Sequence, residues 1–497
     1  MNKIYFYLFL LLLGSCGVAL KFSTSFERMP IGCDEFGYLN LAKSMDAGKT
    51  FTNHSPRPYL PKLIDTLRIK GITENEIAWM VGPHAYHLIP NTYQLINQYP
   101  PGTSYLLSLL PQPMRQKAFP ALIIIALILC ILIAIKSCLK KPFNYFDLVF
   151  PPIIFLMMVA APFTTELSRI NSLAPTFGLL LAGGMLLRKR PFMATLFIAL
   201  SINFRIANAL MVFPILLFLP WKDATSINGF RANLIILGKY LSLLVAATLP
   251  LLLYNYFLTG HPFSTTYSSI DTSMQQSVGV FKNLIYYISM DHWWFRVHVL
   301  GLVILILFLL KRQINLPTLL LLFSFMVLNY IFFGFHQVTM DYYPYASSLI
   351  LFGFALSLMA ENQIAAQLQM AAKLFFLLTT FLIVGIGFQR YSNKTHITYE
   401  TALQQYQVLC EFNVVWADLY SGTSEYVCNN DGFRYGTTTP RARKISMLFL
   451  KANNIKQAIL LDDSTVDSAI ILKEVKEINL NSHVEENNTV GRILIIE

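Results

Sequence analysis

A series of long apolar runs, separated by short polar connections, dominates this chain. A helix needs about 20 apolar residues to cross a hydrocarbon core of about 30 Å, and runs near that length recur along most of the sequence. We place about eleven membrane helices, around residues 4–20, 119–135, 146–163, 173–187, the two halves of 191–221, 233–256, 297–310, 318–333, 343–359 and 373–388. The pattern predicts an all-α polytopic membrane protein.

Two of these runs need closer reading. The run 191–221 is too long for one span and carries "NFR" in its middle, so we divide it with Asn203 and Arg205 near the outer turn. The first run resembles a lipoprotein signal that ends before Cys16. Its apolar character continues through Leu20, however, which favours an uncleaved first transmembrane helix.

Two long polar segments interrupt the membrane pattern. Residues 21–117 follow the first run and contain amphipathic stretches. Residues 389–497 contain the strand-like runs "QAILLDD", "SAIILKEV" and "RILIIE". We therefore expect a transmembrane body over 1–388, with 21–117 as its large first loop, and a small soluble α/β or mixed domain over 389–497.

Composition supports a membrane protein, and charge orients it. The mean hydropathy is +0.51 and only 13% of the residues are charged, against about 25% in soluble domains. The net charge of +11 is concentrated at the ends of apolar runs, as in cytoplasmic loops. This places the N-terminus in the cytoplasm and both long polar segments outside. The chain has no basic stripe interleaved with aromatic residues, so we expect no nucleic-acid partner.

The six cysteines show no metal-ligand spacing. Cys410 and Cys428 both lie in the polar C-terminal segment. They could form a disulfide if that segment faces an oxidising compartment, and the sequence leaves this open.

Asp34 and Glu35 open an amphipathic stretch, "IGCDEFGYLNLAKSM", just after the first apolar run. One interpretation is structural, because Asp is a preferred N-cap and acids in a first turn complement the helix dipole. The other is catalytic, because a partly desolvated carboxylate can accept a proton from an attacking hydroxyl. The two interpretations are compatible, since a cap would also hold the carboxylate in place.

In combination with later motifs, this acid pair resembles a known family. The pair is followed by an amphipathic loop and "YPPGTSYLLSLLP", then by "SINFRIANALMVFPILLFL" and "YNYFLTGHPFSTTY". This order resembles the bacterial relatives of protein O-mannosyltransferases and the lipid A aminoarabinose transferase, which share the GT-C fold. The resemblance extends over roughly residues 4–389.

The resemblance implies a hexosyl- or pentosyltransferase in the bacterial inner membrane. Its donor would be a sugar on a polyprenyl phosphate, and its acceptor a lipid, glycan or protein hydroxyl on the periplasmic face. Asp34 would take the acceptor's proton, with Glu35 as its neighbour, in a direct displacement that inverts the anomeric carbon. The leaving phosphate requires positive charge. Arg205 is the first candidate, although it could also snorkel to the membrane surface, and the lesser candidates are Arg57, Lys62 and His261.

This sequence departs from the family pattern at two positions. Some relatives have a phosphate-binding Lys before the Pro-Pro pair, where this chain has Tyr99, and others have an Asp before the fourth helix, where this chain reads "INSLAP". The departures leave the phosphate ligand and any divalent metal open. Glu166 could supply a second acid, or pair with Arg169. The candidate substrate-binding residues are Tyr38, Tyr99, Glu166, His336 and Asp341.

Two other functions fit a polytopic protein. A transporter or flippase of lipid-linked precursors would favour charges near the middle of spans and repeated halves, and we find few such charges and no halves. An O-antigen polymerase or ligase would usually carry its large outer loop late in the chain, whereas here that loop follows the first helix.

Overall fold

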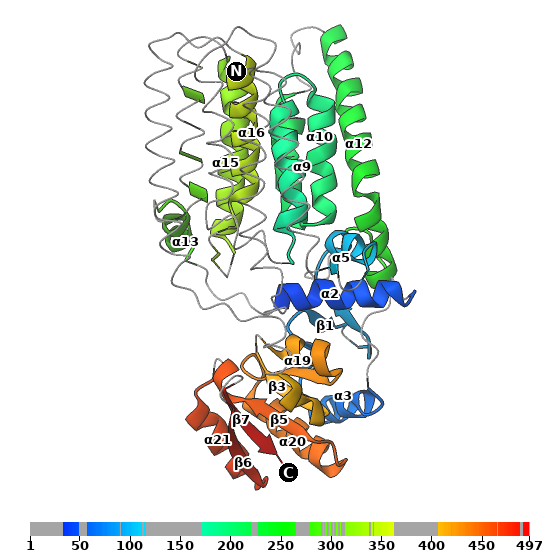
Figure 1. The fold of residues 1–497 in the computed structure, drawn as a ribbon. Coiled ribbons are helices and arrows are strands. Elements are labelled where there is room, and N and C mark those ends of the chain that lie inside the picture. Colours follow the sequence, from blue (N-terminus) through cyan, green and yellow to red (C-terminus); the bar gives the residue numbers. More distant parts are fainter. Residues whose placement is uncertain are drawn as a thin grey trace, which may run out of the picture. The chain divides into compact units, whose positions relative to one another are not determined.

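We describe the protein from a computed structural model (Figure 1). The structure describes residues 33–48, 57–89, 91–111, 114–115, 170–219, 227–264, 279–289, 314–336, 339–340, 342–361, 406–418, 420–464, 466–487 and 491–496, with single positions between 292 and 309. The helices predicted at 4–20, 119–135, 146–163 and 373–388 lie outside these residues, as do Glu166 and Asp341.

The chain divides into two compact units, which we describe separately. The helical unit comprises Met1–Phe26, Lys117–Leu251 and Gln276–Lys394. The mixed unit comprises Glu27–Gln116, Leu252–Gln275 and Thr395–Glu497. The first polar loop and the C-terminal segment thus belong to one unit, although more than 270 residues of sequence separate them.

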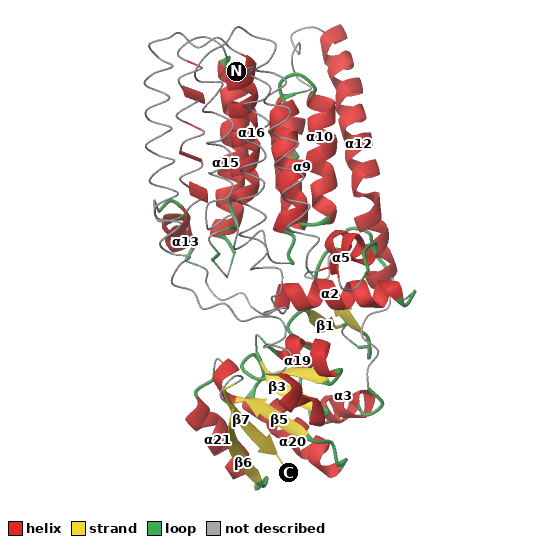
Figure 2. Cartoon of the chain, viewed as in Figure 1, coloured by secondary structure: helices red, strands yellow, loops and turns green. Residues whose placement is uncertain are grey.

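The described helices of the helical unit lie at the predicted places, except the short helix Val280–Tyr287, which we did not predict. These are α9 (Leu173–Leu186), α10 (Pro191–Leu200), α11 (Phe213–Phe218), α12 (Ile227–Thr259), α13 (Val280–Tyr287), α15 (Leu316–Gly334) and α16 (Tyr345–Glu361), drawn in red in Figure 2. Among the described residues, two helices are long and apolar enough to cross a membrane, Gly229–Thr259 and Leu316–Gly334. The last turns of α12, from Leu252 onward, are counted with the mixed unit.

Glycines allow α9 to lie close to its neighbours. A Cβ atom on Gly184 of α9 would lie 2.3 Å from the carbonyl oxygen of Ile350 in α16, and one on Gly353 of α16 would lie 2.4 Å from the carbonyl oxygen of Leu181. Small residues at helix interfaces permit such close backbone approach in membranes, where association depends on van der Waals packing. The two helices therefore pack backbone to backbone.

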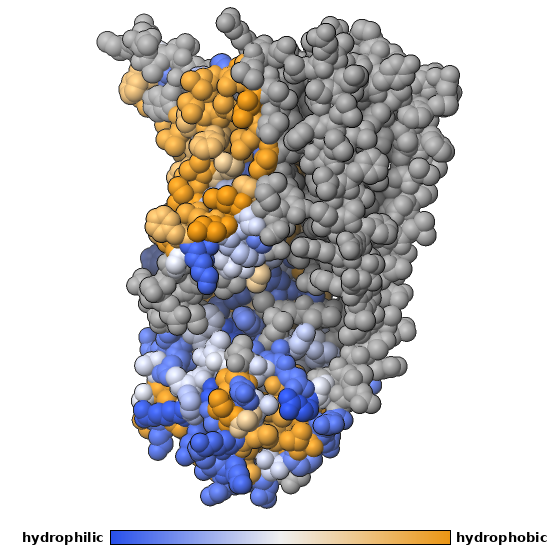
Figure 3. All heavy atoms as spheres, turned by 90° about the vertical axis from the view of Figure 1, so that its left-hand side faces the viewer, coloured by the Kyte–Doolittle hydropathy of each residue, from blue (hydrophilic) through white to orange (hydrophobic). Residues whose placement is uncertain are grey.

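Many exposed side chains in the described part of the helical unit are apolar. Figure 3 shows apolar side chains covering its described part, whereas the surface of the mixed unit combines hydrophilic and hydrophobic residues. Exposed apolar side chains include Leu234, Ile235, Leu241, Val245 and Leu249 of α12 and Phe323, Ile331 and Phe332 of α15. An apolar surface of this extent is typical of a protein that faces lipid.

The first loop contributes helices and a hairpin to the mixed unit. Its elements are α2 (Cys33–Asp46), α3 (Leu60–Ile69), α4 (Glu74–Met80), β1 (Tyr86–Leu88), β2 (Leu95–Asn97) and α5 (Pro101–Ser108). Strands β1 and β2 pair antiparallel, with His87 opposite Ile96. Thr73 begins α4 with a capping box, because its hydroxyl accepts from the Glu76 N–H and the Glu76 carboxylate accepts from the Thr73 N–H.

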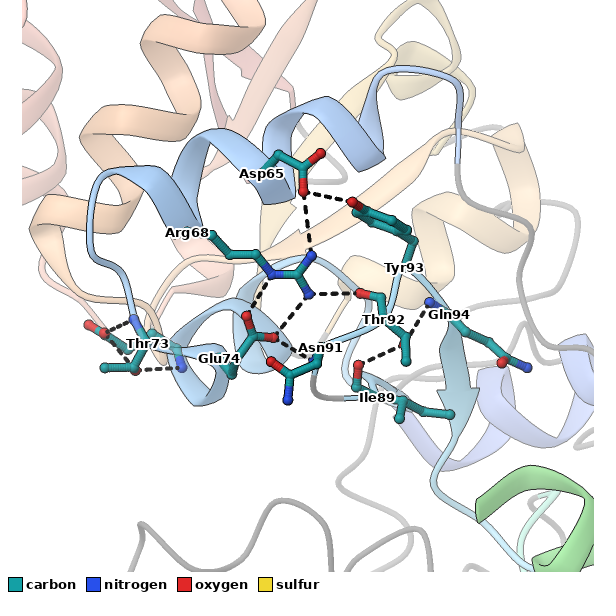
Figure 4. A network of polar contacts seen from close by, with 10 residues as sticks. Asp65, Arg68, Thr73, Glu74, Ile89, Asn91, Thr92, Tyr93 and Gln94 are labelled. Atoms are coloured by element: carbon teal, nitrogen blue, oxygen red, sulfur yellow. Dashed lines mark hydrogen bonds and ion pairs between the residues drawn. The ribbon is translucent and has the colours of Figure 1, made fainter. Parts of the chain in front are cut away.

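A polar network holds the turn of this hairpin against α3 and α4 (Figure 4). The Arg68 guanidinium donates to both carboxylate oxygens of Glu74, at 2.6 and 3.1 Å, and to the carbonyl oxygen of Thr92 at 3.0 Å. Glu74 also accepts from the Asn91 N–H, and Asp65 accepts from the Tyr93 hydroxyl. The hydrogen bond from Arg68 lowers the pKa of Glu74. The network orients the hairpin, and with it the segment that follows β2.

Residues 406–496 form a five-stranded sheet of order β4-β3-β5-β7-β6 (Figure 2). Strand β3 (Val414–Ala417) is parallel to β4 (Asp431–Arg434) and β5 (Gln457–Leu460), and β7 (Gly491–Ile496) is antiparallel to β5 and to β6 (Ser482–Asn487). The helices are α19 (Ser421–Cys428), α20 (Pro440–Ala452) and α21 (Ser468–Glu477). A disulfide joins Cys410 to Cys428, which answers the question that the sequence left open.

One predicted strand is wrong. The run "SAIILKEV" lies in helix α21, whereas "QAIL" and "RILII" are strands as predicted. The Asp467 side chain caps α21 by accepting from the Ala469 N–H. The buried residues of α21, Ile471 and Val475, are four positions apart, which is the spacing of one helix face. Four consecutive apolar residues, Ala469 to Leu472, concealed that spacing in the sequence.

Candidate active site

The predicted acid pair lies at the start of helix α2. Asp34 and Glu35 occupy its first turn and are both partly buried. The helix begins at Cys33, so Asp34 stands within the first turn and not at the capping position itself. In that turn a carboxylate complements the free N–H groups and the positive end of the helix dipole.

Tyr99 is a hydrogen-bond partner of Asp34. Its hydroxyl donates to Oδ1 of Asp34 at 2.6 Å, across 65 positions of sequence. The ring of Tyr38, one turn along α2 from Asp34, lies 4.8 Å from the Tyr99 ring. Both tyrosines are buried, at 2% and 6% exposure. We call Asp34, Tyr38 and Tyr99 the Asp34 site.

A glycine and an asparagine make this contact possible. A Cβ atom on Gly37 would lie 2.6 Å from the Tyr99 ring, so only a glycine leaves room for the ring against α2. Asn97 at the end of β2 donates to the carbonyl oxygen of Gly37 at 2.8 Å and accepts from the Tyr99 N–H at 2.8 Å. These bonds join the hairpin to α2. The motif "NQYPP" thereby places the Tyr99 hydroxyl against the Asp34 carboxylate. Helix α5 then begins at Pro101, where a proline costs no hydrogen bond.

Arg205 lies in the helical unit, at a break between helices. After α10 the chain forms two short 3-10 turns, Ser201–Asn203 and Ile206–Met211, and Arg205 between them is extended. This confirms the predicted division of the run at "NFR". The Asn203 side chain donates to the carbonyl oxygen of Ala247 and accepts from the N–H of Leu251, beside Pro250 in α12. The break is therefore fastened to α12.

Three tyrosines that we did not predict surround the Arg205 guanidinium. Its centre lies 5.5, 5.4 and 5.6 Å from the rings of Tyr342, Tyr343 and Tyr345. One guanidinium nitrogen donates to the Ser172 hydroxyl at 3.2 Å. We call these five residues the Arg205 cluster. A signal existed in the sequence, because "DYYPYA" brings three tyrosines together at an expected outer helix end, and Ser172 lies in the "INSLAP" stretch.

His336, a predicted substrate-binding residue, lies beside this cluster. Its ring is 5.1 Å from the ring of Tyr343, so it shares that tyrosine with Arg205. The carbonyl oxygen of His336 accepts from the Asn283 side chain at 2.8 Å, which fastens the end of α15 to α13. The structure thus brings two predicted residues of the helical unit to one aromatic group.

The lesser phosphate candidates, Arg57, Lys62 and His261, all lie in the mixed unit. Arg57 donates to Asp431 of β4 at 3.3 Å, and the Tyr59 hydroxyl donates to the same carboxylate. Burial, together with this carboxylate, raises the pKa of Tyr59. Lys62 is exposed on α3, and His261 is exposed in the turn after α12. Within the described ranges, no group of three or more His, Cys, Asp or Glu residues is placed to hold a metal.

Two histidines of the first loop lie near Arg434 of the C-terminal sheet, with His87 buried and His84 partly buried. Burial, reinforced by the nearby Arg434 guanidinium, lowers the pKa of His84 to about 3. The same causes hold the pKa of His87 well below its usual value. Both imidazoles are therefore neutral in the folded protein near pH 7. No motif in the sequence singled them out.

The fold is that of GT-C membrane proteins, because solved structures of this class align with nearly the whole chain. Two are structures of ArnT from Cupriavidus metallidurans, one in the apo state and one bound to undecaprenyl phosphate. They are 11% and 10% identical to this chain, with TM-scores of 0.51 and 0.53, and the alignments cover 98% and 99% of this chain and 97% of each of those chains.

A third similar structure is the apo oligosaccharyltransferase of Archaeoglobus fulgidus. It is 11% identical, with a TM-score of 0.50, over 92% of this chain and 69% of that chain. No protein-family model matches the chain, and no curated protein matches it in sequence. The predicted GT-C fold is therefore confirmed.

Proposed function

We propose that this protein is a glycosyltransferase that moves a sugar from a polyprenyl phosphate to a hydroxyl of a lipid, glycan or protein. The GT-C fold supports the class, and one of the similar structures, ArnT, was solved with undecaprenyl phosphate bound. The observation that carries the proposal is the Asp34 site. It presents a partly buried carboxylate in the first turn of a helix and fixes it with the Tyr99 hydroxyl.

In the proposed reaction, the acceptor hydroxyl attacks the anomeric carbon while Asp34 takes its proton. A new carbon–oxygen bond forms on one face of the sugar as the bond to the lipid phosphate breaks on the other, so the anomeric configuration inverts. Tyr99 orients the carboxylate, and Glu35 supports it from the same helical turn. A positioned general base of this kind contributes roughly 10²–10⁴-fold to the rate.

The leaving phosphate takes up negative charge, and we assign its stabilisation to Arg205. The guanidinium is held among three tyrosine rings and the Ser172 hydroxyl. A donor that is already oriented needs no reorganisation as the charge develops. Arg57 is less suited to this role, because its charge is paired with Asp431. His336 beside Tyr343 is a substrate-contact candidate of the same cluster.

We propose a bacterial inner-membrane protein of about eleven spans, with its N-terminus in the cytoplasm. The first loop, residues 21–117, and the C-terminal domain, residues 389–497, would face the periplasm. The Cys410–Cys428 disulfide supports an oxidising compartment for that domain. The apolar surface of α12 and α15 supports burial of these helices in lipid.

The experiment that tests the proposal replaces Asp34. Glycolipids and glycoproteins of a deletion strain are compared by mass spectrometry with those of strains that express wild type, Asp34→Asn or Asp65→Asn. Asp65 is a matched control, because it is an exposed carboxylate of the same loop that accepts from Tyr93. We expect the deletion to remove one sugar, Asp65→Asn to restore it, and Asp34→Asn to lower transfer about 10²–10⁴-fold. Full transfer by stably expressed Asp34→Asn protein would refute the assignment.

A further inference from the structure

The C-terminal sheet has the topology of a ligand-binding fold. Its strands β4, β3 and β5 are parallel and adjacent in that order. From β3 the chain passes through α19 to β4 on one side, and then through α20 to β5 on the other. Folds of this kind bind ligands at the carboxyl ends of the strands where the order reverses, often at the start of the helix after the first strand.

In this protein an aromatic side chain from the first loop occupies the start of that helix. Gly422 is the second residue of α19, and a Cβ atom on it would lie 2.1 Å from Cδ1 and 2.5 Å from Cγ of Phe36. Phe36 is fully buried. Another neighbour is Tyr86 of β1, whose ring lies 5.8 Å away. Phe36 therefore lies between the C-terminal domain and the hairpin.

The C-terminal domain also binds the hairpin segment that contacts Phe36. The buried Arg434 side chain, at the end of β4, donates to the carbonyl oxygens of Pro83 and Tyr86 at 3.0 and 2.5 Å. Its guanidinium lies 4.8 Å from the Trp79 ring. The Ser421 hydroxyl accepts from the N–H of His84 at 3.3 Å. Residues of the C-terminal domain thus contact both Phe36 and the hairpin segment at Tyr86.

Phe36 is two residues from Asp34, so it fixes the turn that carries the carboxylate. Tyr99 contacts the same helix through Gly37 and the Asp34 side chain. The first turns of α2 are consequently held by the hairpin segment at Gly37 and by α19 at Phe36. Displacement of the Phe36 ring would change the packing of the helical turn that carries Asp34.

We infer that the C-terminal domain positions the proposed general base. Phe36 is a residue that positions Asp34, and Gly422 leaves the space that the Phe36 ring occupies. This inference rests on the proposed function of Asp34, and it gives the C-terminal domain a part in that reaction without substrate contact. Related topologies bind a ligand at the start of this helix, whereas in this protein the Phe36 side chain occupies that position.

The first test is Gly422→Ala in the full-length, detergent-purified protein. The added methyl group would overlap the Phe36 ring and displace it. A misplacement of about 1 Å can lower the rate about 100-fold, so we expect kcat to fall about 10- to 100-fold with KM for the lipid donor nearly unchanged. The matched control is Gly238→Ala in α12, where an added Cβ meets nothing within 4 Å, and we expect wild-type turnover.

The second test separates positioning from general loss of stability. Phe36→Leu and Phe36→Ala remove contact with Gly422 in two steps without changing the C-terminal domain, and we expect kcat to fall in that order. Phe36→Ala removes the ring that the methyl group added by Gly422→Ala would overlap. Gly422→Ala should then lower kcat less than about threefold, because residues in direct contact are not additive.

Each outcome decides the inference. If folded Gly422→Ala keeps wild-type kcat, or lowers kcat equally with and without the Phe36 ring, the inference is wrong. If Gly422→Ala is not recovered folded, the Phe36 variants decide, and unchanged kcat in both would overturn it. The Asp34→Asn variant tests the general base separately from its positioning by the C-terminal domain. An inactive Asp34→Asn with a fully active Gly422→Ala would refute positioning and leave the general base intact.

Discussion

Replacing Arg434 by methionine tests how the C-terminal sheet is joined to the first loop. The side chain is 1% exposed, donates to two carbonyl oxygens of residues 83 and 86, and stacks on Trp79. Methionine fills much of the same volume but can neither donate nor stack as a cation. Arg434→Met therefore removes the polar part of the contact and retains most of its packing.

The magnitude follows from these contacts. A hydrogen bond from a charged donor contributes roughly 1.5–3 kcal/mol, and a buried carbonyl left without its donor costs about 1–3 kcal/mol. A desolvated cation–π contact adds about 0.5–2 kcal/mol. Against this, the variant no longer has to bury a charge, which offsets part of the loss. We expect the free energy of unfolding of the mixed unit to fall by about 3 kcal/mol.

Arg441→Met is the matched control for this variant. Arg441 also belongs to the C-terminal sheet region and donates to a main-chain carbonyl of the first loop, that of Lys70 at 2.6 Å. That bond is exposed, so its loss should cost within about 0.5 kcal/mol. Urea-dependent proteolysis of the full-length protein reports the free energy of opening. Equal losses for the two variants, or a loss below about 1 kcal/mol for Arg434→Met, would show that burial does not set the strength of this contact.

Two further predictions concern Arg205 and the two histidines near Arg434. Arg205→Lys keeps the charge but loses the planar group among the three tyrosines, and Arg205→Met loses both. We expect kcat to fall about tenfold and about 10²–10³-fold, and an active Arg205→Met variant would assign Arg205 a purely structural role. His84 and His87, with depressed pKa values, stay neutral when folded but take up protons below about pH 6.5 when unfolded. The free energy of unfolding should therefore fall with decreasing pH below that value, by up to about 1.4 kcal/mol per unit for each histidine. Thermal unfolding at pH 7.5 and 5.5 checks this. A His84→Gln/His87→Gln variant with the same pH dependence as wild type would contradict it.

The local pattern of the sequence determined the elements whose cause is local. Apolar runs placed α9, α12, α15 and α16, because helix length and hydropathy depend on neighbours within a few turns. The polar "NFR" predicted the break near Arg205, and the acid pair predicted the first turn of α2. Where two periods competed, as in "SAIILKEV", the sequence alone chose wrongly, since a short apolar run fits a strand or a helix until its buried face is known.

The contacts of the candidate site depended on tertiary structure. Tyr99 reaches Asp34 across 65 positions, and Arg57 reaches Asp431 across 374. A local sequence pattern does not show whether a loop arginine pairs with a distant carboxylate or binds a phosphate group of a substrate. The physical reason is that a side chain's chemistry depends on which partner desolvates and orients it. The sequence indicated which residues could react, and only the fold decided which of them are held in place and by what.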